Sequence, residues 1–326
     1  MCPHSETIEI YSIGEILVDM IFKSEVKEGG IVEIHFGGAP ANVAVGVARL
    51  GHKAGFIGAV GSDSFGDFLI RTLRENGVDA SLVKVKKART TLAIVTVDPS
   101  GERKFFFYRK PWTETADTML TPDDVQLEML KQSKIIHFTG FSMSQPPFSN
   151  TVEKILDYAV SNRLSVSYDP TFREDIWFSK EDFLSKHDTA LRHANIVSLS
   201  IDEIQAIYGT IDYRKIVEKL FSSYPNINVI AVRLGSKGAY VKTRFDGEAY
   251  RDAFKVRAVD TTGAGDAWTA AFLVSYVLEK IDLENAITFA NAVAAIKCTG
   301  YGAITALPNR EKVKQFLEEN NIFFKN

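Results

Sequence analysis

The residues with the clearest chemical potential form the stretch Asp260-Thr-Thr-Gly-Ala-Gly-Asp266, which directly precedes an apolar segment of helical character. Glycine at positions 263 and 265 lets the backbone turn tightly and aim several N–H groups at one point. The helix that follows adds the positive end of its dipole, so an anion is favoured there. Asp266 falls in the first turn of that helix and faces the same space.

A carboxylate beside amide donors suits phosphoryl transfer, which needs a base for the incoming hydroxyl and donors for the transferring phosphate. The structural alternative is that Asp266 caps the helix and the glycines make a turn. Taken alone, the motif is better explained by this structural alternative. A second motif elsewhere in the chain makes the chemical explanation stronger.

The second motif is Gly37-Gly38-Ala-Pro-Ala-Asn42, near the N-terminus. Gly37 and Gly38 permit close approach of the backbone to a ligand, and Pro40 suits the first turn of a helix. Asn42 offers a donor and an acceptor near that helix start, which suits a polyol. A plain turn from strand to helix is the alternative.

The familiar nucleotide-binding loops do not fit this chain. No GxxxxGK[ST] pattern occurs, and the glycines at 55, 58 and 61 have the wrong spacing for GxGxxG. The pair Gly263 and Gly265 would need Gly or Ala at position 268, which is Trp268. The sequence therefore argues against a dinucleotide-binding dehydrogenase.

Strand-like and helix-like segments alternate through most of the chain. Near-continuous Val and Ile runs joined by helices predict an α/β fold, with a mainly parallel sheet covered by helices on both faces. The expected strands are 8–13, 54–60, 134–138, 164–168, 195–199 and 228–233, and the expected helices are 40–50, 65–76, 151–162, 265–279 and 283–297.

Two segments, 20–36 and 90–109, have no helical period. The second predicts two strands around a tight turn at 98–101. We therefore expect one domain over residues 1–326, with a small β-sheet lid formed by about 20–36 and 90–115.

Composition excludes several classes of protein. The 326 residues carry 38 Lys and Arg against 41 Asp and Glu, a net charge of −3, so we expect no nucleic-acid or membrane partner. Cys2 and Cys298 are far apart and show no metal-ligand spacing. The N-terminus lacks the pattern of a signal peptide, and the most apolar window, 267–278, is too short to span a bilayer. We expect a cytoplasmic protein.

The two motifs, GGAPANVA and DTTGAGDA, resemble the paired motifs of the ribokinase-like (PfkB) carbohydrate kinases, and the resemblance covers about residues 8–308. It implies ATP-dependent phosphorylation of a sugar hydroxyl, and makes this chain an enzyme. Asp266 would be the general base, and the amides of Gly263, Ala264 and Gly265 would form the anion hole.

Within the family, several segments look most similar to fructokinases, including GERKFFFYRKP, TADTML and the stretch from Ser167 to Trp177. The resemblance implies substrate contacts at six residues: Asp19, Gly37, Gly38, Asn42, Arg109 and Arg173. Thr171 stands where fructokinases usually have Asn.

The resemblance also implies a site for ATP and Mg²⁺. Ser200-Ile-Asp-Glu203 resembles the family's NxxE element, so Glu203 is expected to contact Mg²⁺ through water. The nucleotide-binding residues would be Ser200, Gly235, Ser236, Gly238 and Asn291. Asp260, Thr262 and Gly302 match positions where relatives bind a monovalent cation such as K⁺.

The identity of the substrate stays open at this point. The stretch between Arg109 and TADTML, which carries Trp112–Thr115, is slightly longer than expected for a fructokinase. Kinases of 2-keto-3-deoxygluconate and 5-dehydro-2-deoxygluconate share the same scaffold. For those acids Arg109 and Arg173 would hold a carboxylate. A non-catalytic sugar- or nucleotide-binding regulator is a remote alternative. Exposed β edges favour pairing with another chain, so a homodimer through the lid strands is one expected arrangement.

Overall fold

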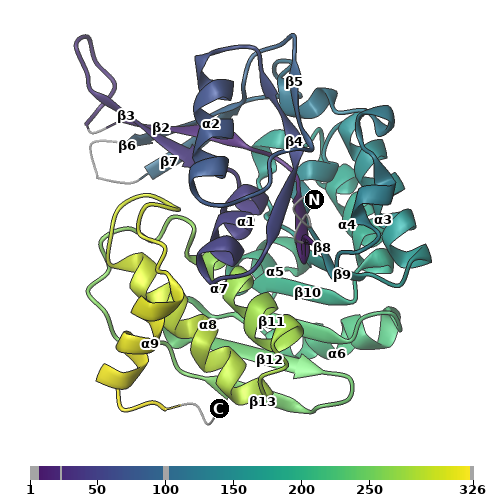
Figure 1. The fold of residues 1–326 in the computed structure, drawn as a ribbon, viewed down its shortest axis with the longest axis vertical. Helices are drawn as coiled ribbons and strands as arrows, with labels where there is room; N and C mark the ends of the chain where they lie inside the picture. Colours follow the sequence, from purple (N-terminus) through teal and green to yellow (C-terminus); the bar gives the residue numbers. More distant parts are fainter. Residues whose placement is uncertain (1–6, 23, 98–102, 324–326) are drawn as a thin grey trace, which may run out of the picture.

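The main feature of the fold is a nine-stranded sheet, shown in Figure 1 for a computed structural model that describes residues 7–22, 24–97 and 103–323. The seven strands from β11 to β5 run parallel, whereas β12 and β13 are antiparallel at one edge. The order is β13 (Glu248–Arg251), β12 (Ala239–Thr243), β11 (Val229–Arg233), β10 (Ile196–Ser200), β9 (Ser165–Asp169), β8 (Ile135–Thr139), β1 (Ile10–Ile13), β4 (Ala54–Gly61) and β5 (Val83–Lys86).

Residues of the parallel strands β1, β4, β8, β10 and β11 are divided between two separate hydrophobic cores. On β11, for example, Val229 and Ala231 pack on one face, and Ile230 and Val232 pack on the other. The helices that contribute to the first core are α1 (Ala39–Arg49), α2 (Ser64–Glu75), α7 (Ala264–Phe272), α8 (Leu283–Cys298) and α9 (Arg310–Glu319). Those of the second are α3 (Phe148–Ser161), α4 (Lys180–His193), α5 (Ile201–Tyr208) and α6 (Tyr213–Ser223). Helices therefore cover both faces, as the sequence predicts.

A second, four-stranded sheet lies to one side of the large sheet (Figure 1). We call it the small sheet. Its strands, in order, are β3 (Val32–Gly37), β2 (Leu17–Phe22), β6 (Leu92–Val97) and β7 (Arg103–Tyr108). The segments 20–36 and 90–109 thus form antiparallel strand pairs, as expected, and β2 pairs with β6 in parallel. The turn predicted at 98–101 lies outside the described residues.

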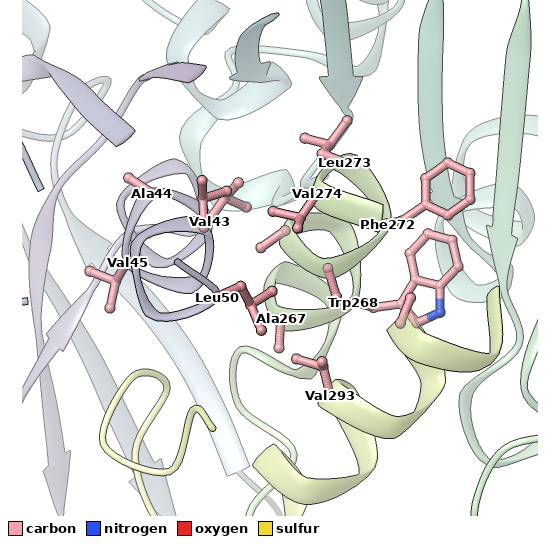
Figure 2. Packing of buried hydrophobic residues seen from close by; sticks show 14 of the residues in the cluster. Val43, Ala44, Val45, Leu50, Ala267, Trp268, Phe272, Leu273, Val274 and Val293 are labelled. Carbon is pink, nitrogen blue, oxygen red and sulfur yellow. The ribbon is translucent and has the colours of Figure 1, made fainter. Parts of the chain in front are cut away.

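Helices α1 and α7 pack against each other at very short range. A Cβ atom on Gly46 of α1 would lie 2.7 Å from the Cβ of Ala270 on α7. Figure 2 shows α1 beside the central helix α7, with Val43 and Ala44 of α1 and Ala267 of α7 in the same hydrophobic cluster. This contact brings the N-termini of both helices to the same place.

Several elements differ from the sequence predictions. The helix expected at 265–279 is α7 followed by a π-helical turn, Leu273–Leu278. Helices α4, α5, α6 and α9 and strands β5, β12 and β13 were not among the predicted elements. Within the described ranges, no helix is long and apolar enough to cross a membrane.

Candidate active site

A pocket of about 960 Å³ lies at the carboxyl ends of the parallel strands. Asp169, Ser200 and Arg233 end three neighbouring strands there, and Glu15 follows β1. Chain order reverses between β1 and β8, and open α/β sheets bind ligands at such a switch point. The small sheet covers one side of the pocket, through residues on one face of its strands: Leu17, Asp19, Ile21, Ala93, Val95 and Phe107.

The N-terminus of α7 forms one wall of this pocket. Gly263, at φ +74°, sits at the N-cap position, and a Cβ there would also lie 2.9 Å from that of Ala303. Gly263 and Gly265 line the pocket, so the start of α7 presents its positive dipole end to a ligand. The expected anion hole is smaller than predicted, because the amide of Ala264 donates to the carbonyl of Thr261 at 3.1 Å.

Asp266 lies in the first turn of α7 and faces the pocket. Its Oδ2 accepts a hydrogen bond from Nδ2 of Asn42, on α1, at 2.8 Å. Burial raises the pKa of Asp266 to about 6, although this hydrogen bond favours the carboxylate. A carboxylate with such a pKa is ionised at neutral pH and is a better proton acceptor than an ordinary aspartate.

Asp19 and Asn42 supply polar atoms on the side of the pocket nearest the small sheet. The buried Oδ1 of Asn42 has no hydrogen-bond partner among the described residues, which leaves an acceptor for a ligand hydroxyl. Burial, and then the charge of Asp266, raise the pKa of Asp19 to about 7. Gly37 makes room for this side chain, because a Cβ at Gly37 would lie 2.6 Å from Oδ2 of Asp19.

Gly38 also lines the pocket, at φ +107°, and its carbonyl accepts from the amide of Asn42 at 2.8 Å. A Cβ at Gly38 would lie 2.4 Å from the carbonyl oxygen of Glu15. Gly37 itself is outside the pocket lining. The two glycines therefore allow the backbone and Asp19 to pack closely, and a direct ligand contact is open to Gly38.

Arg233 is a charged pocket residue that the sequence analysis missed. Its Nη1 lies 2.7 Å from Oδ2 of Asp169, and its Nη2 lies 3.4 Å from Oε2 of Glu203. Burial lowers the pKa of Arg233, but the charges of Asp169 and Glu203 raise it by more, so the guanidinium stays charged. A Cβ on Gly265 would be 3.0 Å from Nη1, which places this cation beside the start of α7. A buried cation there favours an anionic ligand.

Ser200 and Glu203 form a capping box at the start of α5. Oε2 of Glu203 accepts from the amide and hydroxyl of Ser200, both at 2.8 Å, and Oε1 accepts from the amide of Phe172 at 3.1 Å. Glu203 and the neighbouring Asp202 line the pocket as oxygen donors of the type that Mg²⁺ prefers. Both oxygens of Glu203 already accept hydrogen bonds, so a magnesium ion here would be held through water, which suits Mg²⁺ because it usually keeps several of its waters.

The residues expected to bind the nucleotide divide into two groups. Gly235 and Ser236 line the pocket. Gly238 lies outside the lining, and at φ +101° its missing side chain allows the backbone to pass Arg251. Asn291 is buried, accepts from Nε1 of Trp268 at 2.8 Å and donates to two backbone carbonyls. Asn291 is outside the pocket lining and its side-chain amide is held by these partners, so its adenine contact stays a prediction.

Arg109 and Arg173 have opposite surroundings. Arg109 is fully buried outside the pocket lining, with Nε 2.6 Å from Oδ2 of Asp117 and Nη1 2.6 Å from Oγ of Ser144. These partners link the end of β7 to the main body, and the structure does not place Arg109 in the pocket, so its substrate contact stays a prediction. Arg173 lines the pocket with an exposed side chain, and its positive charge favours ionisation of Asp19 and Asp266.

The predicted monovalent-cation residues are joined by hydrogen bonds between the loop before α7 and the loop after α8. Oδ1 of Asp260 accepts from the amide and hydroxyl of Thr262, at 3.0 and 2.7 Å. Oδ2 accepts from the amide of Gly302 at 2.9 Å. The carbonyl of Asp260 accepts from Nζ of Lys297 at 2.8 Å, so an ammonium already binds the expected cation ligand.

Comparison with known proteins identifies the class of this chain. Residues 7–310 match the pfkB family of carbohydrate kinases, so the chain belongs to that family, as the resemblance of its motifs predicts. It is accordingly a phosphotransferase with an alcohol acceptor, built on a ribokinase-like fold.

Individual relatives cover nearly the whole chain. Fructokinase-1 of Zea mays is 37% identical over 324 residues, which are 95% of this chain and 98% of the relative. The ATP-bound fructokinase of Xylella fastidiosa has 30% identity and a TM-score of 0.86, covering 96% of this chain and 99% of that one. A fructokinase double mutant of Vibrio cholerae O395, with fructose, ADP and a potassium ion bound, has 29% identity and a TM-score of 0.84, covering 95% and 98%.

Proposed function

We propose that this carbohydrate kinase is a fructokinase, which transfers the γ-phosphoryl group of ATP to a hydroxyl of D-fructose. The observation that carries the proposal is the Asn42–Asp266 hydrogen bond, which joins the starts of α1 and α7 in the pocket that Asp19 also lines. A sugar beside Asp19 and Asn42 and a phosphate at the N-terminus of α7 would meet at Asp266. The names of the relatives support fructose as the sugar.

In this mechanism Asp266 accepts the proton of the sugar hydroxyl while the hydroxyl oxygen bonds to the γ-phosphorus. The bond from that phosphorus to the β,γ-bridging oxygen breaks, and ADP leaves. The amides at Gly263 and Gly265, the helix dipole and Arg233 stabilise negative charge on the transferring group. Bound Mg²⁺, held by Glu203 and Asp202 through water, would neutralise phosphate charge.

A sugar acid is the second candidate substrate, and Arg173 is the observation that favours it. Its exposed guanidinium lines the pocket, whereas Arg109 is committed to Asp117. A single arginine can still bind a carboxylate through two parallel hydrogen bonds. The candidates are then 2-keto-3-deoxygluconate and 5-dehydro-2-deoxygluconate.

The experiment is ADP release with ATP and Mg²⁺ against fructose, ribose, the two sugar acids and adenosine. We expect a clear preference for fructose, and Arg173→Lys should then change its kcat/KM by less than about tenfold. Preference for an acid, with a larger loss in Arg173→Lys, would contradict fructokinase activity and keep the phosphoryl-transfer mechanism. ADP release with none of these compounds would contradict both substrate assignments.

The proposal also includes a homodimer formed through the small sheet. The face of that sheet away from the pocket exposes Ile34, Phe106 and Tyr108, and exposed apolar side chains of this kind favour association. The cytoplasmic location expected from the sequence stays a prediction.

A further inference from the structure

Lys297 is a buried cation that the phosphoryl-transfer mechanism does not use. It lies in the last turn of α8, and its side chain is fully buried. Its Nζ donates to the carbonyl oxygen of Asp260 at 2.8 Å and lies 4.0 Å from Oδ2 of the same residue. A buried ammonium is costly unless a counter-charge and hydrogen bonds stabilise it, and Asp260 supplies both.

Asp260 connects two loops that set the position of α7. Its carboxylate binds Thr262 in its own loop and the amide of Gly302 in the loop that follows α8. Burial opposes its charge, yet hydrogen bonds from Thr262 and Gly302, together with Lys297, lower its pKa. The next glycine, Gly263, packs against Ala303 of the second loop, so the connected loops place the wall that faces the phosphate.

A potassium ion does not fit this arrangement. The oxygens of Asp260 that could bind it already accept hydrogen bonds from Lys297, Thr262 and Gly302. A second cation at these oxygens would lie within a few ångströms of the Lys297 ammonium, where like charges in a poorly solvated region repel strongly. The surroundings of Asp260 therefore disagree with its predicted role as a ligand of a monovalent cation.

We infer that the ammonium group of Lys297 is a built-in substitute for the monovalent cation and holds the Asp260 loop in place for catalysis. Because the cation is part of the chain, its occupancy does not depend on the salt concentration, unlike that of a dissociable ion. Lys297 is thus a positioning residue, which acts on the anion site through Asp260 and Gly263. The expected effect of Lys297 on turnover rests on the proposed function, whereas the expected absence of potassium binding does not.

The test compares KCl with choline chloride at equal ionic strength, using thermal unfolding and sugar-dependent ADP release. For the unmodified protein, we expect the same Tm in both salts and turnover within about twofold. Lys297→Ala should lower the Tm and reduce turnover by about 10- to 100-fold in choline chloride, because a displaced loop misaligns the reacting groups. KCl should restore part of both losses, since the small side chain leaves space for an ion.

Two further variants sharpen the comparison. Lys297→Met keeps the length of the side chain without its charge, so it should lose turnover and show no recovery in KCl. Lys312→Ala removes an exposed lysine on α9 and should match the unmodified protein in both salts.

A rise of several-fold in turnover, or a potassium-specific rise in Tm, for the unmodified protein would overturn the inference. So would a Lys297→Met variant with unchanged Tm and turnover. If the unmodified protein phosphorylates no sugar, the proposed function fails, and the Tm values still decide the cation question.

Discussion

At the scale of single residues, Asp266 combines a chemical advantage with an energetic cost. Its half-buried position at the pocket floor raises its pKa to about 6, which suits a group that must accept a proton and later release it. The same burial disfavours the carboxylate at neutral pH. Sites of this kind commonly reduce stability for the sake of function.

We predict two consequences of this raised pKa. The kcat/KM for the sugar should fall as the pH drops through about 6, because protonated Asp266 cannot accept the hydroxyl proton. The stability that this group contributes is present below its unfolded pKa and is lost as the pH rises through about 6. Asp266→Asn should therefore raise the Tm at neutral pH, by about 1–3 °C.

Differential scanning calorimetry and pH–rate profiles measure these effects. Asp123→Asn, at an exposed aspartate, is the matched control and should leave the Tm unchanged. A lower Tm for Asp266→Asn, or a kcat/KM that stays constant down to pH 4, would contradict this account of Asp266.

The sequence identifies Asp266 and Asn42 because each belongs to a local motif with its own turn and helix start. It does not identify Arg233, whose role depends on carboxylates that come from two other strands, β9 and β10. The positions of Arg109 and Asn291 outside the pocket are hard to predict for the same reason. Their partners, Asp117 and Trp268 among them, become visible only when the packed structure is known.

At the scale of elements, the site depends on the close approach of α1 and α7. Asn42 and Asp266 lie on different helices and 224 positions apart in sequence, yet they are hydrogen-bonded. Four residues further along each helix, Gly46 and Ala270 meet at a distance that leaves no room for another methyl group. The helix crossing thus sets the geometry of the Asn42–Asp266 pair.

We predict that Gly46→Ala destabilises the protein by about 1–3 kcal/mol, because the added methyl group overpacks the crossing. In an unconstrained helix the same change would be stabilising, by about 1 kcal/mol. Ala270→Gly in the Gly46→Ala background should recover part of the loss. Urea unfolding of the two single variants and the double variant measures this coupling. Additive effects of the two changes would contradict a direct contact.

The alternation of apolar strands and helices is enough to predict the parallel sheet and its two covered faces, and the two segments without helical period predict the small sheet. The antiparallel edge strands β12 and β13 and the polar helix α4 escape prediction, because their patterns are weak in the sequence. The π-helical turn after α7 also escapes prediction, since its apolar residues continue the pattern of an ordinary helix.

At the scale of the whole molecule, a charged cluster joins distant parts of the chain. His52, after α1, donates or accepts at both ring nitrogens, 2.8 Å from Glu9 and 2.9 Å from Glu279. Glu279 also accepts from Arg310 of α9 at 2.6 Å. Burial would raise the pKa of Glu279, but His52 and Arg310 lower it to about 2. Hydrogen bonds to Glu279 and Glu9 raise the pKa of His52 against the effect of its burial.

We predict that His52→Gln costs about 1–2 kcal/mol of stability near pH 5–6 and less at high pH. The His52 contribution is complete below its unfolded pKa and is lost as the pH rises through its raised folded value. The Glu279 contribution is present above its unfolded pKa and is lost as the pH falls through about 2. Urea unfolding at several pH values measures how the stability cost of His52→Gln changes with pH. His193→Gln, which breaks a pair with the exposed Asp157, is the control and should cost less at every pH.

The central claim is that Asp266 accepts the proton of a sugar hydroxyl during phosphoryl transfer, and Asp266→Asn tests it most directly. Steady-state ADP release with fructose, together with calorimetric titration of ATP in the presence of Mg²⁺, separates catalysis from nucleotide binding. We predict a fall in turnover of about 10²–10⁴-fold, with an ATP dissociation constant close to that of the unmodified protein. Turnover within a few-fold of the unmodified enzyme would contradict the assignment of Asp266 as the base.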